Sequence, residues 1–326
     1  MTQPIKFAIL GAGNIAHTMA RTVTQMPGVV PYAVAARELD RAQAFAAQYG
    51  FSKAYGSYEQ LLADPQVELV YIATPHSHHA AQALACLEAG KHVLCEKAFT
   101  VNAQQARQVL DTARQKGLLV AEAIWPRYMP MAQRLREVCQ SGIIGRVHTL
   151  TADLGYSVFA RPRIHDPALA GGALLDVGIY PLTFAAIAFG SQVEGVTSTA
   201  VMADTGVDAQ NSVLLTYAGG RMAVLHSSVV AVSHRAGALQ GEDGFAVVEN
   251  VNNYESIRVY DRDRVQIAEY RQPRQITGFE YEVRACVEAI RAGQVECPQM
   301  PHREILRMME LMDTIRGQWG LRYPFE

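Results

Sequence analysis

Two patterns of apolar and polar positions alternate over the first third of the chain. Short continuous apolar runs, typical of strands buried on both faces of a parallel sheet, are followed by segments with apolar residues at helical spacing. The expected strands are 5–10, 29–35, 67–73, 91–95 and 118–123, and the expected helices are 15–26, 40–49, 58–63, 80–89 and 103–116. This alternation predicts an α/β domain with a doubly wound parallel sheet over residues 1–123.

After residue 124 the pattern changes to short strands separated by turns. The expected strands are 147–159, 193–203, 211–217, 221–230, 244–248, 256–260 and 265–269, and the expected helices are 126–139, 173–189, 278–292 and 302–317. Gly219-Gly220 predicts a hairpin turn. Residues 124–326 are therefore predicted to form an α+β domain whose large, mostly antiparallel sheet has helices on one face. An uncovered apolar sheet face usually binds a partner, so we expect a homodimer through it.

The turn after the first strand reads GAGNIA at residues 11–16, which is the dinucleotide-binding fingerprint in its strand–turn–helix setting. Gly11 permits the tight turn, and Gly13 lets a pyrophosphate approach the backbone. Asn14 and Ile15 open the helix, whose N-terminus offers free N–H groups and the positive end of its dipole to phosphate. The alternative is a glycine turn that binds nothing, but the setting favours a nucleotide site.

The second strand ends in Ala35-Ala36-Arg37, without the acidic residue that hydrogen-bonds the ribose of NAD. A guanidinium here binds a 2′-phosphate through charge-assisted, bidentate hydrogen bonds. Arg37 therefore predicts a preference for NADP (NADPH). Glu38 is expected in the acid-rich first turn of the next helix. The alternative for Arg37 is a solvated surface charge.

Two later strand ends supply further candidate contacts, because the ligand of an open parallel sheet lies over the carboxyl ends of its strands. The histidines at 76–79 lack the spacing and the accompanying carboxylate or cysteine of a metal site, so no metal is predicted. Lys97 is the first candidate for catalysis, since a lysine over a cofactor can polarise a substrate oxygen; the alternative is a surface lysine. The expected cofactor contacts here are Thr74, Pro75, His76, His79, Glu96 and Lys97.

Asp176 and Tyr180 are four residues apart in an apolar segment, so a helix would place them on one face. We expect them to meet Lys97 over the nicotinamide, where a lysine ammonium would lower the tyrosine pKa from its ordinary value near 10. Tyr180 would then move the alcohol proton, and Asp176 would orient the substrate hydroxyl or the lysine. The alternative is a buried polar pair with a structural role.

Composition narrows the class of protein. The 326 residues are 49% hydrophobic and 18% charged, with a net charge of −2, which favours a globular protein without a basic surface for nucleic acid or membrane. We expect no apolar run approaching the roughly 20 residues that cross a bilayer, and no signal peptide. Five scattered cysteines without Cys-x-x-Cys spacing favour the reducing cytoplasm over disulfides or zinc.

These motifs together resemble the Gfo/Idh/MocA family of oxidoreductases over essentially the whole chain. The resemblance is carried by GAGNIA, by TPHSHHAAQA after a strand, by CEKAFT and by GGALLDVGIYP. It implies an N-terminal Rossmann domain over 1–123 and a C-terminal domain for substrate binding and dimerisation over 124–326. It also implies that Lys97 is catalytic. Ala98 stands where the family commonly has proline, which changes the stiffness of the loop but not the lysine.

Tyr180 stands where many members of the family have histidine. Together with EAIWPRYMP at 122–130 and Arg37, it resembles the branch of dimeric dihydrodiol dehydrogenases and NADP-dependent D-xylose dehydrogenases. The resemblance implies oxidation of arene trans-dihydrodiols, or of pyranoses at the anomeric carbon. It places Trp125 and Arg127 near cofactor and substrate, although Trp125 could equally be a core aromatic. Further candidates for the pocket lining are Tyr156, Phe159 and His165.

The sequence thus predicts an NADP-dependent oxidoreductase that moves hydride between nicotinamide and a secondary alcohol or carbonyl of a small cyclic diol or sugar. Other reactions known on this fold are those of glycosidases with bound cofactor and of biliverdin reductases. A nucleotide-binding sensor without turnover is the nonenzymatic alternative. Arg37 and Lys97 favour ordinary redox turnover, and a sensor would have no need of Lys97, Asp176 and Tyr180 together.

Overall fold

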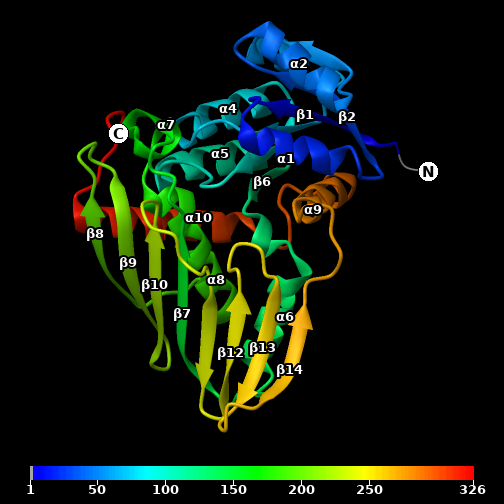
Figure 1. Cartoon of the computed structure of the whole chain (residues 1–326). Coiled ribbons are helices and arrows are strands. Elements are labelled where there is room, and N and C mark those ends of the chain that lie inside the picture. Colours follow the sequence, from blue (N-terminus) through cyan, green and yellow to red (C-terminus); the bar gives the residue numbers. More distant parts are fainter. Residues whose placement is uncertain (1–2) are drawn as a thin grey trace. The chain divides into compact units, whose positions relative to one another are not determined.

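The N-terminal segment of the chain forms a six-stranded parallel sheet in the computed structural model, which describes residues 3–326 (Figure 1). The strand order is β3-β2-β1-β4-β5-β6, so the order reverses between β1 and β4. The strands are β1 (Ile5–Leu10), β2 (Val29–Ala35), β3 (Lys53–Tyr55), β4 (Leu69–Ile72), β5 (His92–Glu96) and β6 (Val120–Ala123). The predicted doubly wound sheet is confirmed; β3 was not predicted because it has three residues and no buried one.

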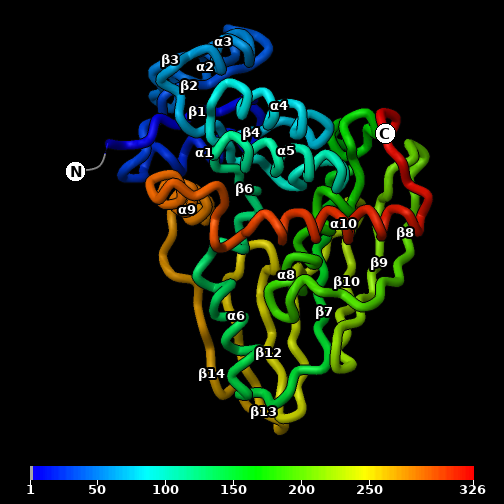
Figure 2. The backbone as a smooth tube through the Cα atoms, turned by 180° about the vertical axis from the view of Figure 1, so that it is seen from behind, coloured from blue at the N-terminus to red at the C-terminus, as the bar shows by residue number. Residues whose placement is uncertain are grey.

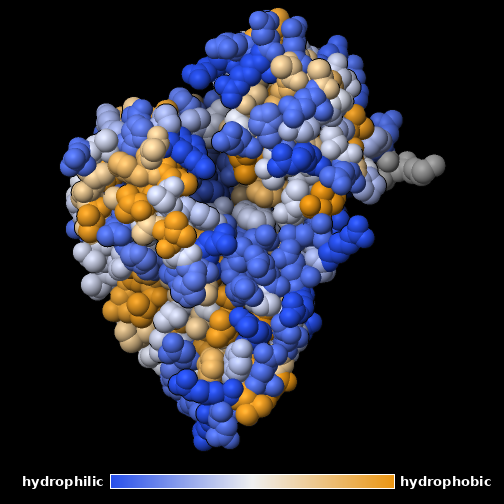
Figure 3. Space-filling view, viewed as in Figure 1, coloured by the Kyte–Doolittle hydropathy of each residue, from blue (hydrophilic) through white to orange (hydrophobic). Residues whose placement is uncertain are grey.

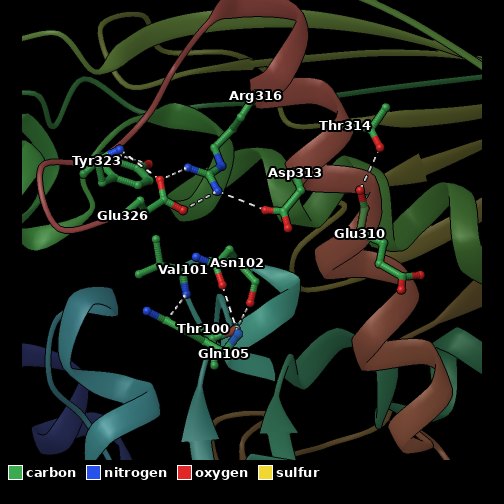
Figure 4. A network of polar contacts seen from close by, with 11 residues as sticks. Thr100, Val101, Asn102, Gln105, Glu310, Asp313, Thr314, Arg316, Tyr323 and Glu326 are labelled. Atoms are coloured by element: carbon green, nitrogen blue, oxygen red, sulfur yellow. Dashed lines mark hydrogen bonds and ion pairs between the residues drawn. The ribbon is translucent and has the colours of Figure 1, made fainter. Parts of the chain in front are cut away.

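Five helices connect these strands. They are α1 (Asn14–Val23), α2 (Leu39–Tyr49), α3 (Tyr58–Ala63), α4 (His76–Glu88) and α5 (Ala103–Lys116). The side chain of Asn102 accepts a hydrogen bond from the N–H of Gln105 at 2.9 Å, and the Gln105 side chain accepts one from Val101 at 3.2 Å (Figure 4). This reciprocal cap fixes the start of α5, and Gly117 at φ +65° ends it.

The chain divides into two units, and the division differs from the predicted boundary at 123/124. The first unit comprises the residues up to Tyr128 together with 275–306, and the second comprises 129–274 and 307–326. The segment 275–306 joins the first unit because α9 (Glu280–Arg291) buries its apolar face there, in contact with α1 and β5. The backbone N–H of Val120 also donates to the carbonyl of Val295 at 3.0 Å.

The second unit is built on an eight-stranded sheet in the order β14-β13-β12-β11-β7-β10-β9-β8. Only β7 and β10 pair in parallel, which confirms the predicted antiparallel character. Gly219 and Gly220 have φ of +75° and +76° in the hairpin between β9 and β10. The strands are β7 (Val147–Gly155), β8 (Gly195–Met202), β9 (Asp208–Tyr217), β10 (Arg221–Ser228), β11 (Gly237–Gly241), β12 (Gly244–Glu249), β13 (Ser256–Asp261) and β14 (Gln266–Arg271).

Helices cover one face of this sheet. The helix α8 (Ile179–Phe189), entered through a π-helical turn at Leu174–Gly178, packs on β7 and β10, and α6 (Pro130–Gln140) packs on α8 (Figure 2). Among the described residues, 167–189 form a helical segment long and apolar enough to cross a membrane, contrary to our expectation. Its most apolar window is 94% buried inside the structure, which explains an apolar composition on all sides. The remaining helices are α7 (Pro162–His165) and α10 (His302–Trp319).

The opposite face of the sheet carries exposed apolar side chains among polar ones, most densely over β8–β10 (Figure 3). On β10 the burial alternates: Ala223 and Leu225 are buried, whereas Met222 and Val224 are 38% and 48% exposed. This alternation is that of a sheet with helices on one face and none on the other.

Candidate active site

The glycine turn after β1 has the geometry that a dinucleotide requires. Gly11 has φ +99°, and a Cβ there would lie 3.1 Å from a methyl carbon of Thr74 and 3.2 Å from the carbonyl oxygen of Ala73. A Cβ at Gly13 would meet only that oxygen, at an ordinary 3.8 Å. The chain itself therefore explains Gly11 but not Gly13, whereas a pyrophosphate close to the backbone explains Gly13. Gly13 is the N-cap of α1, so the helix dipole points its positive end at this place.

A cationic patch lies where β2 ends. Arg37 is exposed there, and its charge acts on two neighbours. Burial lowers the pKa of His78 and the Arg37 guanidinium lowers that pKa further. Burial raises the pKa of Tyr58, and the positive charges of Arg37 and Arg41 offset part of that increase. Arg41 also donates to the carbonyl of Ala12, inside the glycine turn, at 2.7 Å. The sequence reasoning missed Arg41, which lies in the first turn of α2, whereas Arg37 lies in the bend just before that helix.

The loop after β4 enters a helix earlier than expected. Pro75 is the N-cap and His76 the first residue of α4, so most of the predicted loop is helical. His79 is fully buried, with its ring nitrogens 2.9 Å from the Ala98 carbonyl oxygen and 2.8 Å from that of Thr74. The His79 side chain thus ties the loops after β4 and β5 together. Its expected contact with the cofactor stays a prediction, as do those of Thr74, Pro75 and His76.

Lys97 follows β5 directly and is half-buried. Its backbone N–H donates to the Glu96 carboxylate at 3.2 Å, and the Tyr71 hydroxyl donates to the other oxygen of that carboxylate. Burial lowers the pKa of His79, and the nearby Lys97 ammonium lowers it further. Lys97 is therefore a cation held at the carboxyl edge of the parallel sheet, the edge where the glycine turn also lies.

Two buried carboxyl groups lie close to this strand end. Glu122, in β6, accepts a hydrogen bond from the N–H of Phe99 at 2.9 Å, and burial raises its pKa to about 7. Glu282, in α9, is fully buried; neither of its oxygens has a hydrogen-bond partner among the described residues. Burial and the charge of Glu96 raise the pKa of Glu282 well above its ordinary value. Sequence reasoning missed both groups, because their burial follows from long-range packing.

Trp125 and Arg127 follow β6 in the first unit. The indole of Trp125 stacks on Phe279 with ring centroids 4.7 Å apart, and a Cβ on Gly278 would lie 2.7 Å from that indole. Arg127 donates to the Gln299 carbonyl at 2.9 Å and pairs with Glu304 at 3.1 Å. The packing of Trp125 matches the alternative of a core aromatic. The proximity of these two residues to cofactor and substrate stays a prediction.

Asp176 and Tyr180 belong to the second unit, at the entrance to α8. Both are buried, at 4% and 8% exposure. Asp176 lies in the π-helical turn rather than in a regular α-helix, and such turns are frequent at functional sites. Arg163, on α7, pairs with Asp176 through N–O distances of 2.6 and 3.5 Å, which is a contact that sequence reasoning missed. The meeting of these residues with Lys97 of the first unit stays a prediction.

The three predicted lining residues share one loop region after β7. Tyr156 accepts hydrogen bonds from Asn252 at 3.2 Å and from Arg235 at 3.3 Å. Phe159 and His165 face each other with ring centroids 5.9 Å apart, and a ring nitrogen of His165 lies 3.0 Å from the Phe159 carbonyl oxygen. Their role in a substrate pocket stays a prediction. Over residues 3–326, no group of three His, Cys, Asp or Glu side chains could hold a metal ion.

A Rossmann sheet with a glycine turn and a lysine at a strand end defines a nicotinamide-dinucleotide oxidoreductase, and the family comparison agrees. A family model described as "Oxidoreductase family, NAD-binding Rossmann fold" matches residues 5–124, and the GFO/IDH/MocA C-terminal domain model matches residues 132–247. The chain belongs to the Gfo/Idh/MocA family.

The chain is similar to individual members of the family over nearly its whole length. The chain is 35% identical to the trans-1,2-dihydrobenzene-1,2-diol dehydrogenase of Mus musculus and 34% identical to that of Homo sapiens, with 98% of each chain covered. Among solved structures it is similar to KijD10, a 3-ketoreductase from Actinomadura kijaniata in complex with NADP and TDP-benzene. That likeness has a TM-score of 0.89 and 26% identity, covering 97% of this chain and 98% of the other.

Proposed function

We propose that this protein is an NADP-dependent dehydrogenase that moves hydride between nicotinamide and a secondary alcohol or carbonyl of a cyclic vicinal diol or sugar. The observation that carries the proposal is the position of Lys97, a half-buried cation at the same sheet edge as the GAGNIA turn. A cation at this edge can polarise a substrate oxygen next to the nicotinamide ring.

The NADP preference rests on the patch at the end of β2. Arg37 and Arg41 both lie there, and two guanidinium groups favour a 2′-phosphate where an acidic side chain would repel it. Glu38 is the exposed N-cap of α2 and accepts no capping hydrogen bond. KijD10, which was solved with NADP, supports the same choice.

When bound, the nicotinamide supplies the hydride acceptor or donor. Lys97 polarises the oxygen of the reacting carbon through its ammonium group. Tyr180 takes the hydroxyl proton during oxidation and returns it during reduction. Asp176, held by Arg163, accepts a hydrogen bond from the substrate hydroxyl and so fixes its orientation.

The substrate class follows from the relatives named for trans-1,2-dihydrobenzene-1,2-diol. The test is NADP reduction by the purified protein with a trans-cyclic diol and D-xylose side by side, each repeated with NAD. Turnover with NADP on the diol supports the proposal in full, and turnover of D-xylose alone moves the substrate to sugars. Tight NADPH binding without turnover on any alcohol or carbonyl would contradict it and favour a sensor.

We also propose that two copies of the chain pair through the open face of the eight-stranded sheet. The exposed Met222 and Val224 lie on β10, the third strand from the β8 edge, and Figure 3 shows apolar side chains over β8–β10. Sedimentation velocity should give the mass of a dimer, and Val224→Glu should convert it to a monomer because it buries a charge in the interface. A monomer in the unsubstituted protein would contradict the pairing.

A further inference from the structure

The turn that carries Asp176 begins on a buried carboxylate from a distant strand. Asp208, the first residue of β9, is fully buried. Its Oδ2 accepts the backbone N–H of Leu174 at 2.8 Å and the side-chain amide of Asn211 at 2.8 Å. Leu174 is the first residue of the π-helical turn. One carboxylate oxygen thus satisfies an N–H at the start of the turn, as a capping side chain does at a helix N-terminus.

The polar chain continues across the sheet to the other end of the same turn. The Asn211 side-chain oxygen accepts a hydrogen bond from the Ser227 hydroxyl at 3.0 Å, and these residues are register partners on β9 and β10. A Cβ on Gly178 would lie 2.9 Å from the Ser227 oxygen, so the last residue of the π-helical turn lies against that hydroxyl. Asp208, Asn211 and Ser227, which we call the buried polar chain, therefore span the turn from its first residue to its last.

The glycine pair before the turn fits the same arrangement. Gly172 has φ +109°, and a Cβ there would lie 2.2 Å from Oδ1 of Asp208. The Tyr323 hydroxyl donates to the carbonyl of Gly171 at 2.7 Å. Tyr323 is in turn held near the chain end, where Glu326 pairs with Arg316 at 2.7 Å (Figure 4). The backbone before Asp176 is thus held by groups from β9 and from the C-terminal segment.

Beginning a helix on a buried carboxyl group lowers the stability of the fold, because burial removes the group from water. Burial raises the pKa of Asp208 to about 7, and its Oδ1 has no hydrogen-bond partner among the described residues. A serine or asparagine would cap the turn at smaller desolvation penalty. The arrangement is explained if the direction of the side chains on this turn matters more than the stability of the fold. A π-helical turn is a rare interruption of α-helical geometry, and a shift of one residue in the helical register turns a side chain by about 100° around the axis.

We propose that the buried polar chain Asp208–Asn211–Ser227 is a positioning device that holds the π-helical turn and thereby directs Asp176 and Tyr180 at the substrate. This inference rests on the proposed function, in which those two side chains contact the substrate. The three residues touch neither substrate nor cofactor in this scheme. They act through the backbone of the turn.

The test compares Asp208→Ala, Asp208→Asn and Ser227→Ala. Asp208→Ala should lower kcat about 10- to 100-fold, because the reacting groups lose their alignment, while the Kd for NADPH stays within twofold. Asp208→Asn should recover most of kcat. Its amide oxygen, at the position of Oδ2, can accept from both Leu174 and Asn211 as the carboxylate oxygen does, and the bond from Ser227 to Asn211 is kept. Ser227→Ala should fall between the wild type and Asp208→Ala.

Val259→Ala is the matched control, because it removes buried methyl groups from β13 without touching the turn. It should lower the melting temperature and leave kcat unchanged. The proposal is overturned if Asp208→Ala keeps kcat within twofold of wild type, if Val259→Ala loses as much, or if Asp208→Asn recovers nothing.

Amide hydrogen exchange separates this inference from the proposed function. With no substrate present, Asp208→Ala should speed amide exchange at residues 174–178 but not in β9 or β10. If the wild type turns over no diol or sugar, the proposed function has failed, and exchange still decides whether Asp208 holds the turn. Unchanged exchange at 174–178 would overturn the inference even in an active enzyme.

Discussion

The glycine turns at Gly11 and Gly172 precede the two segments that carry the candidate site, and they differ in which parts of the chain contact them. Gly11 and Gly172 both have φ near +100° and both pass close to other atoms. At Gly11 the nearest atoms come from the adjacent loop, at Ala73 and Thr74. At Gly172 the nearest atom is an oxygen of Asp208, a side chain from another strand. The first turn is therefore specified by neighbouring strand ends that the sheet brings together, and the second by a buried contact across the fold.

The comparison assigns cofactor affinity to the first region and alignment of the reacting groups to the second. Lys97 tests that assignment most severely, because it lies in the first unit but belongs to the chemistry. Lys97→Met should lower kcat by about 10³-fold or more and leave NADPH affinity within a few-fold. Stopped-flow turnover and fluorescence titration measure the two. Lys116→Met, on an exposed lysine, is the control. Turnover near wild type would remove Lys97 from the mechanism.

Each region also holds one carboxyl group whose pKa burial raises to about 7, Glu122 in the first and Asp208 in the second. Between the ordinary carboxyl pKa and pH 7 the folded state binds more protons than the unfolded state. The free energy of unfolding therefore falls as the pH rises through that window, by on the order of 3 kcal/mol for each group. Urea unfolding from pH 4.5 to 8 measures the slope.

Glu122→Gln and Asp208→Asn should each flatten that slope, and the two effects should add because the groups belong to separate units. A slope that neither substitution changes would show that other groups govern the pH dependence. A stability that rises over the same window would contradict the raised pKa of both.

The cationic patch tests whether the first region reads the 2′-phosphate. Arg37→Ala should weaken NADP binding by about 1.5–3 kcal/mol and NAD binding much less, since only NADP carries the charged partner. Arg41→Ala should weaken both cofactors, because Arg41 also holds the Ala12 carbonyl in the glycine turn. Isothermal titration with each cofactor separates the cases. An equal loss for NADP and NAD in Arg37→Ala would contradict the phosphate assignment.

The smallest expected effects compare the two glycine turns directly. Gly11→Ala and Gly172→Ala each force a side chain into a positive φ and a close contact, at a stability cost of about 1–3 kcal/mol. Gly11→Ala should raise the Kd for NADPH with little change in kcat at saturation. Gly172→Ala should lower kcat with little change in Kd. The same pattern in both variants would dissolve the distinction between the regions.

The fold was largely readable because its signals are local. Strand–helix alternation, the GAGNIA turn and the cap at Asn102 depend on residues close in sequence, and each is present in the structure. The strands β3 and β11 escaped prediction because they are short, and one ends in glycine. The return of 275–306 to the first unit depends on which apolar face α9 meets, which helical periodicity cannot say.

The candidate site was readable in its motifs but not in their supports. Lys97, Asp176 and Tyr180 stand out as polar residues at strand ends or in apolar segments. Arg163 and Asp208 do not stand out, because no residue near them in the sequence indicates that their partners lie 13 and 34 residues away. Glu282 looks like a first-turn helix acid, and only the packing of α9 reveals it as fully buried.

The return of α9 to the first unit limits how this protein can be taken apart. A fragment ending at Tyr128 would lose the helix that packs on α1 and β5, the hydrogen bond between the hydroxyls of Thr22 and Thr277, and the backbone contact at Val120. Apolar surface of the nucleotide-binding sheet would then face water. Residues up to Tyr128 are thus not the whole dinucleotide-binding unit of this chain. To transfer that unit to another protein, two stretches of sequence that are separated by the second unit must be moved together.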